Sequence, residues 1–346
     1  MSLARPQSCP RAAAAARLAA CALLLLSPAL YAGSARAQAS GAAPPPDAVA
    51  SASVIFTALG KDGKFVGGLK AEDVRASVDG SPVQVLALRP QTNAPLFLAV
   101  VLDTSASQER LIQNTKMAAD LFVRGVMEPG ADKVAVVTFA GQTVLEQGMT
   151  GDVDRVRAAI ARVTFVPPPN IVVSGLPPTD LTAAAATGVW DAVWLVAGDV
   201  LPRSLGQGRR AMLLVTDGVD TNGRMKLADA VAASLQSEVV AYPIGVGDSK
   251  YFDGVDKSPL RKLAEQTGGR AFFPKRPSEL TNIFLQISEE LSSQYVVTFA
   301  APTAARDGSF HKVKLELANK TLRGAGVELS YPQGYYAGNA STAVRK

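Results

Sequence analysis

The chain has 346 residues, of which 48% are apolar, with 35 Lys and Arg, 30 Asp and Glu, two Cys and one His. This length suffices for two domains of about 150 residues each, and the large apolar fraction excludes a disordered polymer. The single His excludes most multi-histidine metallohydrolase mechanisms. No run reaches the roughly 20 uninterrupted apolar residues that a membrane-spanning helix needs.

Residues 1–37 have the pattern of an export signal. Arginines precede an apolar run over residues 18–32, and Ala35 and Ala37 supply the small residues that a signal peptidase reads. Cleavage before Gln38 removes both cysteines and four Arg, which leaves 31 basic and 30 acidic residues. We therefore expect an exported protein, periplasmic or secreted, with no disulfide, no integral membrane segment in the mature chain and no nucleic-acid partner.

The mature chain divides into β-rich ends and an α/β middle. Residues 38–50 are small and Pro-rich, as in a flexible linker. Short strand-like runs then predict an N-terminal β segment over residues 51–93 and a C-terminal one over 293–338, followed by a tail over 339–346. The runs lie at residues 52–58, 74–78, 83–88, 295–299, 311–317 and 327–331.

The middle region, residues 94–292, alternates strands with helices. Residues 96–102 are apolar on both faces, as in a strand that helices cover on both sides of a parallel sheet. The sequence therefore predicts a doubly wound, mostly parallel, Rossmann-like α/β domain. It is inserted between two antiparallel β segments that together form a small β-sandwich. The further strands are predicted at 134–139, 211–216, 239–246 and 271–273, and the helices at 112–126, 152–163, 187–201, 226–235, 259–267 and 279–291.

Oxygen-bearing side chains gather where ligands bind in such sheets, at the carboxyl ends of the strands. Asp103, Ser105 and Ser107 follow the first buried strand, and Asp217 follows the strand at 211–216. Thr187 begins a helix between them. An all-oxygen donor set with two carboxylates suits a hard cation, Mg²⁺ or Mn²⁺. The alternative is that these residues only cap the following helix.

The stretches LAVVLDTSAS, TGVWDAV and LLVTDG, in this order, resemble the von Willebrand factor type A (VWA) domain with its metal-ion-dependent adhesion site. With flanking motifs such as TGGRAFFP, SSQYVVTF and QGYYA, the mature chain resembles exported bacterial VWFA-related proteins. The resemblance implies that both serines coordinate the ion directly and that the aspartates often do so through water. It also implies a threonine ligand, Thr187 or the upstream Thr179; Trp190 follows Thr187 in the family register, which favours Thr187.

These patterns predict an exported, non-enzymatic adhesion module that holds a divalent cation and engages an Asp or Glu of a protein ligand. Two alternatives remain: a metal-dependent hydrolase, which lacks an evident general base beyond the ligating aspartates, and a structural assembly module with a vestigial site. His311 lies far along the chain from the metal motif, so we expect a structural role for it. Asp220 is expected to be a turn or helix-cap residue.

Overall fold

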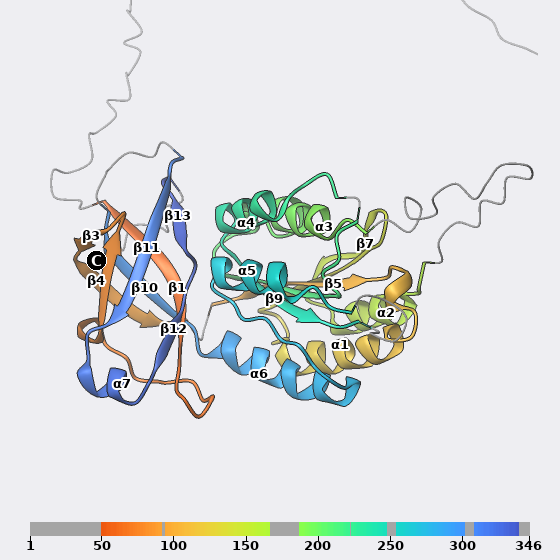
Figure 1. Ribbon diagram of the computed structural model, residues 1–346, viewed down its shortest axis with the longest axis horizontal. Coiled ribbons are helices and arrows are strands. Elements are labelled where there is room, and N and C mark those ends of the chain that lie inside the picture. The colour runs from red at the N-terminus through yellow and green to blue at the C-terminus, as the bar shows by residue number, and fades with distance from the viewer. Residues whose placement is uncertain are drawn as a thin grey trace, which may run out of the picture. The chain divides into compact units, whose positions relative to one another are not determined.

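Figure 1 shows the computed structural model of the chain, which describes residues 50–91, 94–166, 187–221, 223–247, 254–301 and 308–338. The predicted export signal, nearly all of the predicted linker, Thr179 and the tail lie outside the described residues, so those predictions are untested. No helix in the described part of the chain has the length and apolar character needed to cross a membrane.

The β segments from the two ends of the chain form two four-stranded antiparallel sheets with the orders β12-β1-β10-β4 and β13-β11-β2-β3. In the first sheet β1 pairs with β10, so that Ser51 lies opposite Ala300. A short helix, α7 (Lys320–Gly324), follows β11. The strands are β1 (Ser51–Leu59), β2 (Val74–Val78), β3 (Ser81–Val83), β4 (Val85–Pro90), β10 (Tyr295–Ala300), β11 (Phe310–Leu317), β12 (Glu328–Ser330) and β13 (Gly334–Tyr336).

Alternate side chains of these strands form one shared core. In β10 every second residue, Tyr295, Val297 and Phe299, is buried, and β11 shows the same period over its last five residues. Residues of both sheets pack into a single hydrophobic cluster. The period of two is that of sheets with one face inward and one face toward solvent. The predicted sandwich is therefore confirmed, and strands of both terminal segments build it.

The middle of the chain folds around a five-stranded sheet of order β7-β6-β5-β8-β9. Strand β5 (Leu96–Asp103) runs parallel to β6 (Lys133–Phe139) and to β8 (Arg209–Thr216), and β9 (Val239–Gly245) is parallel to β8. All eight residues of β5 are buried. The edge strand β7 (Thr143–Thr150) is antiparallel.

Helices cover both faces of this sheet (Figure 1). One face packs against α1 (Ile112–Val126), α2 (Val153–Arg162) and α6 (Leu280–Ser292). The other packs against α3 (Val189–Leu195), α4 (Leu227–Gln236) and α5 (Lys257–Thr267). This confirms the doubly wound, mostly parallel α/β prediction, and it places the carboxyl ends of β5 and β8 side by side.

The structure differs from the predicted elements at three places in the α/β domain. Strand β7 was not predicted, because an edge strand with few buried residues lacks a clear apolar pattern. Residues 271–273 form only an isolated bridge, Ile244 to Phe272, rather than a strand. The helix predicted over 187–201 begins at Val189, and its last part, Val196–Val200, is a π-helical turn.

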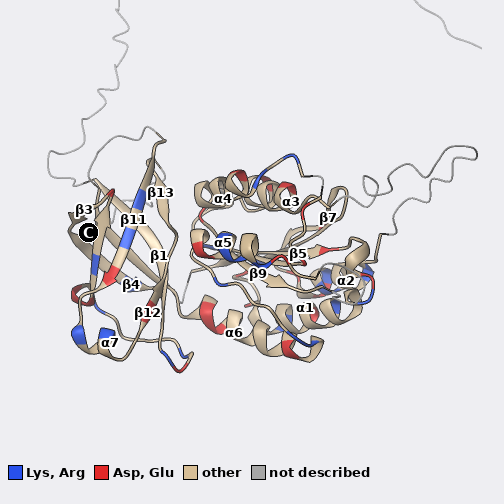
Figure 2. Cartoon of the chain, in the orientation of Figure 1, with Lys and Arg blue, Asp and Glu red and all other residues tan. Residues whose placement is uncertain are grey.

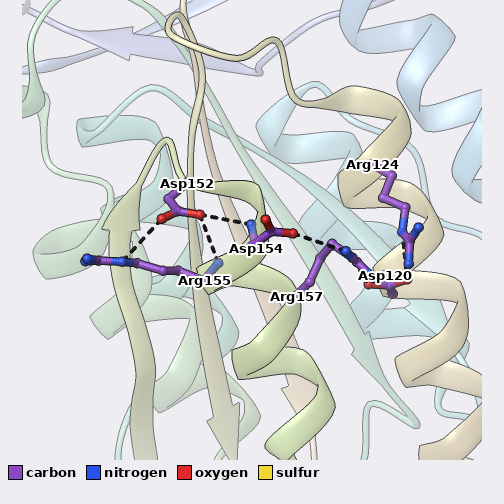
Figure 3. A network of polar contacts seen from close by, with 6 residues as sticks. All are labelled: Asp120, Arg124, Asp152, Asp154, Arg155 and Arg157. Carbon is purple, nitrogen blue, oxygen red and sulfur yellow. Dashed lines mark hydrogen bonds and ion pairs between the residues drawn. The ribbon is translucent and has the colours of Figure 1, made fainter.

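Charged side chains of both signs are interspersed along the described elements (Figure 2). On α1 and α2 they form the polar network of Figure 3. Arg157 of α2 donates to Asp120 of α1 at 2.8 Å and so links the two helices. Because these side chains are partly exposed, we expect each pair to contribute at most about 1 kcal/mol. The other members are Arg124, Asp152, Asp154 and Arg155.

One carboxyl group is buried at the end of α6. The side chain of Glu290 is 2% exposed, and its Oε2 lies 3.1 Å from Arg270 Nε without the alignment of a hydrogen bond. Burial raises the pKa of Glu290 to about 7, although the positive charge of Arg270 acts in the opposite direction. The fold thus contains an acid whose ionised form is poorly compensated.

Candidate metal centre

The candidate centre lies where β5 and β8 end. Asp103 is the last residue of β5, Ser105 is the N-cap of the short 3₁₀ helix Ala106–Gln108, and Ser107 lies within that helix. Asp217 follows β8 directly. Because the two strands are adjacent and parallel, with Leu102 opposite Val215, their carboxyl ends bring these side chains to one place.

Three hydroxyl and amide groups hold the Asp103 carboxylate. Its Oδ1 accepts from the Ser105 backbone N–H at 2.9 Å and from Ser105 Oγ at 2.5 Å. Its Oδ2 accepts from Thr216 Oγ1 at 2.6 Å. The side chain is therefore fixed from both sides, and the residue is only 2% exposed. Such support orients a carboxylate before any ligand arrives.

The serines join this carboxylate to the second one. Ser105 Oγ and Ser107 Oγ lie 3.2 Å apart. A hydrogen bond from the Ser107 side chain stabilises the ionised form of Asp217, whose Oδ1 also accepts from the Val219 backbone N–H at 3.0 Å. The structure thus brings together four of the five predicted site residues: Asp103, Ser105, Ser107 and Asp217.

The electrostatics of this cluster are those of two acids buried close together. Burial first, and the charge of Asp217 second, raise the pKa of Asp103 to about 7. Burial also raises the pKa of Asp217. A divalent cation would relieve both penalties, because it supplies the positive charge that the two carboxylates lack. The donors present therefore fit a hard cation.

Carboxylates alone do not make up this centre. Among the described residues no group of three or more His, Cys, Asp or Glu that could hold a metal is found. The cluster instead combines two carboxylates with neutral hydroxyls. Sites with only oxygen donors are typical of Mg²⁺ and Mn²⁺, whereas zinc sites are typically rich in nitrogen and sulfur donors.

Thr187 is the fifth predicted residue, and its described contacts lead elsewhere. Its backbone N–H donates to Thr221 Oγ1 at 2.8 Å, while its carbonyl accepts from the Thr221 N–H at 3.0 Å. The next residue, Gly188, donates to the carbonyl of Ala140 just beyond β6. Thr187 is buried, and these bonds hold it near the end of β6. None of its described hydrogen bonds reaches the serines or aspartates of the centre.

The structure assigns supporting roles to residues that were not among the predicted metal ligands. Thr216 binds Asp103, and Gln108 Nε2 donates to the carbonyl of Val246 at 3.1 Å. Gly218 has a φ of +79°, and a Cβ there would lie 2.8 Å from the carbonyl oxygen of Asp256. The Thr-Asp-Gly motif contained the signal for Thr216 and Gly218, since both flank Asp217.

Asp220 has the capping role that the sequence indicated, and His311 lies away from the centre in a hydrogen-bonded group with Asp79 and Ser309. Asp220 Oδ1 accepts from the Val189 N–H at 2.8 Å and so caps the start of α3. In the sandwich, His311 Nδ1 lies 2.7 Å from Asp79 Oδ2, and Nε2 lies 3.1 Å from Ser309 Oγ. Asp79 Oδ1 also accepts from the backbone N–H of Lys312, so the group ties the β2–β3 turn to β11.

The comparisons with solved structures give several similar chains. A mussel byssus protein, proximal thread matrix protein 1 with a zinc-occupied MIDAS motif, is 22% identical over 61% of this chain and 48% of its own, with a TM-score of 0.46. BatB from Bacteroides thetaiotaomicron is 16% identical over 57% of this chain and all of its own, with a TM-score of 0.42. A von Willebrand factor type A protein from Catenulispora acidiphila is 12% identical over 82% and 74%, with a TM-score of 0.44.

This chain thus spans about half the length of the mussel protein. No curated protein matches it. A family model for the von Willebrand factor type A domain, however, matches residues 98–286, which is more than half of the sequence. That range begins within β5 and ends within α6, and it includes all the residues of the candidate centre. The chain belongs to the von Willebrand factor type A domain family.

Proposed function

We propose that this protein is an exported binding module, whose divalent cation engages an acidic residue of a protein ligand. Domains of this family are commonly adhesion or protein-interaction modules. The observation that carries the proposal is the convergence of Asp103, Ser105, Ser107 and Asp217 at the ends of β5 and β8. Thr187, which is buried and precedes α3, is proposed as the fifth ligand.

The chemistry of the donors supports a ligand-binding role. Two carboxylates balance the charge of Mg²⁺ or Mn²⁺, and the hydroxyls of the serines and the threonine add none. A bound divalent cation would retain Lewis acidity toward a further anionic oxygen, which an Asp or Glu of the partner supplies. The chain's own residues hold the site rigid: Thr216 and Ser105 fix Asp103, and Ser107 fixes Asp217.

A binding module fits the site better than a metal-dependent hydrolase does. A hydrolase needs a base that takes a proton from water, in reach of the metal. The carboxylates described here are occupied by hydroxyl and backbone donors, and the sole His lies in β11, bonded to Asp79 and Ser309. The export part of the proposal rests on the pattern of residues 1–37, and N-terminal sequencing of the protein from its native host tests it.

Titration calorimetry with Mg²⁺ and with Mn²⁺ tests the metal site. We expect binding by the wild type, its loss in Asp103→Ala, and unchanged binding in Asp154→Ala, which removes an exposed carboxylate from α2. Comparison of Thr187→Val with Thr179→Val identifies the threonine ligand, since only the ligand's loss lowers the affinity. If neither ion binds at millimolar concentration, the proposal is wrong.

A pull-down from the native envelope tests the adhesive role. Immobilised wild-type protein with Mg²⁺ is compared with the same protein in a chelator, with Asp103→Ala and with Asp154→Ala. We expect a partner in the wild-type and Asp154→Ala samples alone. A partner retained by Asp103→Ala, or in the presence of the chelator, would show that the interaction does not pass through the cation.

A further inference from the structure

A groove opens beside the candidate metal centre. It has a volume of about 350 Å³ and lies between the approach to α1, the end of β9 and the segment that leads into α6. This is space for a few side chains of a bound peptide. Arg110, Val246, Gly247, Lys275, Arg276 and Leu280 are among the residues that line it.

Two contacts place this groove directly next to the proposed metal ligands. Gln108 Nε2 donates to the carbonyl of Val246, a residue that lines the groove. The same nitrogen lies 3.5 Å from Ser107 Oγ. Gly247 borders Asp217 so closely that a Cβ on this glycine would lie 3.2 Å from Asp217 Cβ. A peptide that presents a carboxylate to the cation therefore has the groove as its neighbouring surface.

The rim of the groove is basic. Arg110, Lys275 and Arg276 are all exposed, and they reach the groove from two segments that are far apart in the sequence. Glu279 is an acidic neighbour of the last two: its Oε1 lies 3.8 Å from Arg276 Nε, and its Oε2 accepts from the Lys275 backbone N–H. Because the Arg276 side chain is 80% exposed, this ion pair is weak.

The floor of the groove, in contrast, is apolar. Val246 and Leu280 are buried residues of the hydrophobic cluster that packs under α1 and α6. An apolar floor with a cationic rim accommodates the aliphatic part of a Glu side chain and pairs with its carboxylate. Charge complementarity therefore identifies the occupant as an acidic peptide segment.

We propose that this groove binds acidic side chains that flank the metal-ligating carboxylate of the protein ligand. The inference rests on the proposed function and adds to it the sequence character of the partner. The partner segment carries one Asp or Glu at the cation and at least one more in the groove. Lys275 and Arg276 then act as specificity residues, and they are separate from the residues that hold the metal.

Two biotinylated peptides test this on a biosensor surface, one of six glutamates and one of five glutamines with a single central glutamate. With Mg²⁺ we expect the wild-type protein to bind the six-glutamate peptide about tenfold more tightly, an advantage that added salt reduces. In Lys275→Glu/Arg276→Glu the advantage disappears, while binding of the single-glutamate peptide and of Mg²⁺ is unchanged. Lys275→Ala/Arg276→Ala, which introduces no repulsion with Glu279, is expected to lose most of it.

The matched control is Lys320→Glu/Arg323→Glu, the same charge reversal on α7 of the sandwich, which keeps the full advantage. If both peptides bind equally in Mg²⁺ and the groove variants change nothing, the groove inference is wrong and the proposed function stands. If binding of the six-glutamate peptide survives chelation but is lost in the groove variants, the groove binds acids and the metal-dependent function is wrong. If neither peptide binds, both are overturned.

Discussion

Replacing Thr216 by Val removes one hydroxyl from the support of Asp103 while keeping the shape of the side chain. Thr216 is fully buried, and its Oγ1 donates to Asp103 Oδ2 at 2.6 Å and accepts from the Gly218 N–H at 3.0 Å. A hydrogen bond to an ionised group contributes about 1.5–3 kcal/mol. Loss of a residue that orients a metal ligand typically lowers metal affinity by about 10- to 100-fold. At 1.4 kcal/mol per tenfold this is about 1.4–2.8 kcal/mol of binding free energy, which is close to the contribution of the hydrogen bond.

We therefore expect Thr216→Val to bind Mg²⁺ about 10- to 100-fold more weakly in calorimetry at pH 8. The free energy of unfolding at pH 8, without metal, should fall by about 2–3 kcal/mol. At pH 5 the fall should be smaller, because Asp103, with a pKa of about 7, is then protonated. Thr216→Ser, which retains the hydroxyl, should recover most of the affinity.

Thr138→Val is the matched control for this experiment. Thr138 lies on strand β6, on the other side of β5 from Thr216; it is buried and donates to Glu146 Oε1 at 2.8 Å, so its loss also removes a hydroxyl–carboxylate bond. We expect a loss of stability but unchanged Mg²⁺ binding. If Thr216→Val binds Mg²⁺ as the wild type does, or if Thr138→Val weakens binding equally, the claim that Thr216 positions Asp103 for a cation is refuted.

Three further predictions concern stability and reactivity. Glu290 has a pKa of about 7 in the folded protein against an ordinary value of 4.5, so its contribution to stability is full below pH 4.5 and is lost as the pH rises to about 7. In chemical denaturation, the unfolding free energy of Glu290→Gln relative to wild type should thus rise by about 2.5 kcal/mol between pH 5 and pH 8; a constant difference would contradict a poorly compensated acid. Gly218→Ala should destabilise the fold by at least about 1 kcal/mol, through its positive φ and its contact with Asp256, whereas Gly198→Ala, with open space around the glycine, should not. Ser309 and Asp79 each lie within hydrogen-bond distance of His311, and we expect this group to be structural. A fluorophosphonate should therefore leave Ser309 unlabelled as judged by mass spectrometry; labelling that requires His311 would favour a hydrolase.

The buried elements of the fold were predictable because their patterns arise from burial itself. Strand β5 has apolar residues on both faces, and both of its faces are buried. In β10 every second residue is buried, so only one face of this strand packs into the core. Strand β7 was missed since its residues are mostly half-buried at an edge. The π-helical turn at Val196–Val200 was missed because apolar periodicity does not distinguish it from a continued α-helix.

The site was predictable to the extent that its residues follow strand ends. Asp103 ends β5 and Asp217 follows the adjacent parallel strand β8, and this register makes their side chains meet. The sequence does not show which neighbours support them: Gln108 bonds the carbonyl of Val246, 138 positions away. The groove beside the centre was also not predictable, because Arg110 and Lys275 come together only through the packing of separate segments.

The pairing of β1 with β10 has a consequence for the order of folding. Ser53 Oγ and Thr298 Oγ1 lie 2.8 Å apart, although the residues are 245 positions apart in the chain. Closing an unstructured loop of that length costs roughly 5 kcal/mol of chain entropy. Prior compaction of the inserted domain removes most of this cost by bringing its two ends together. We therefore expect the sandwich to assemble last, after the domain that interrupts it.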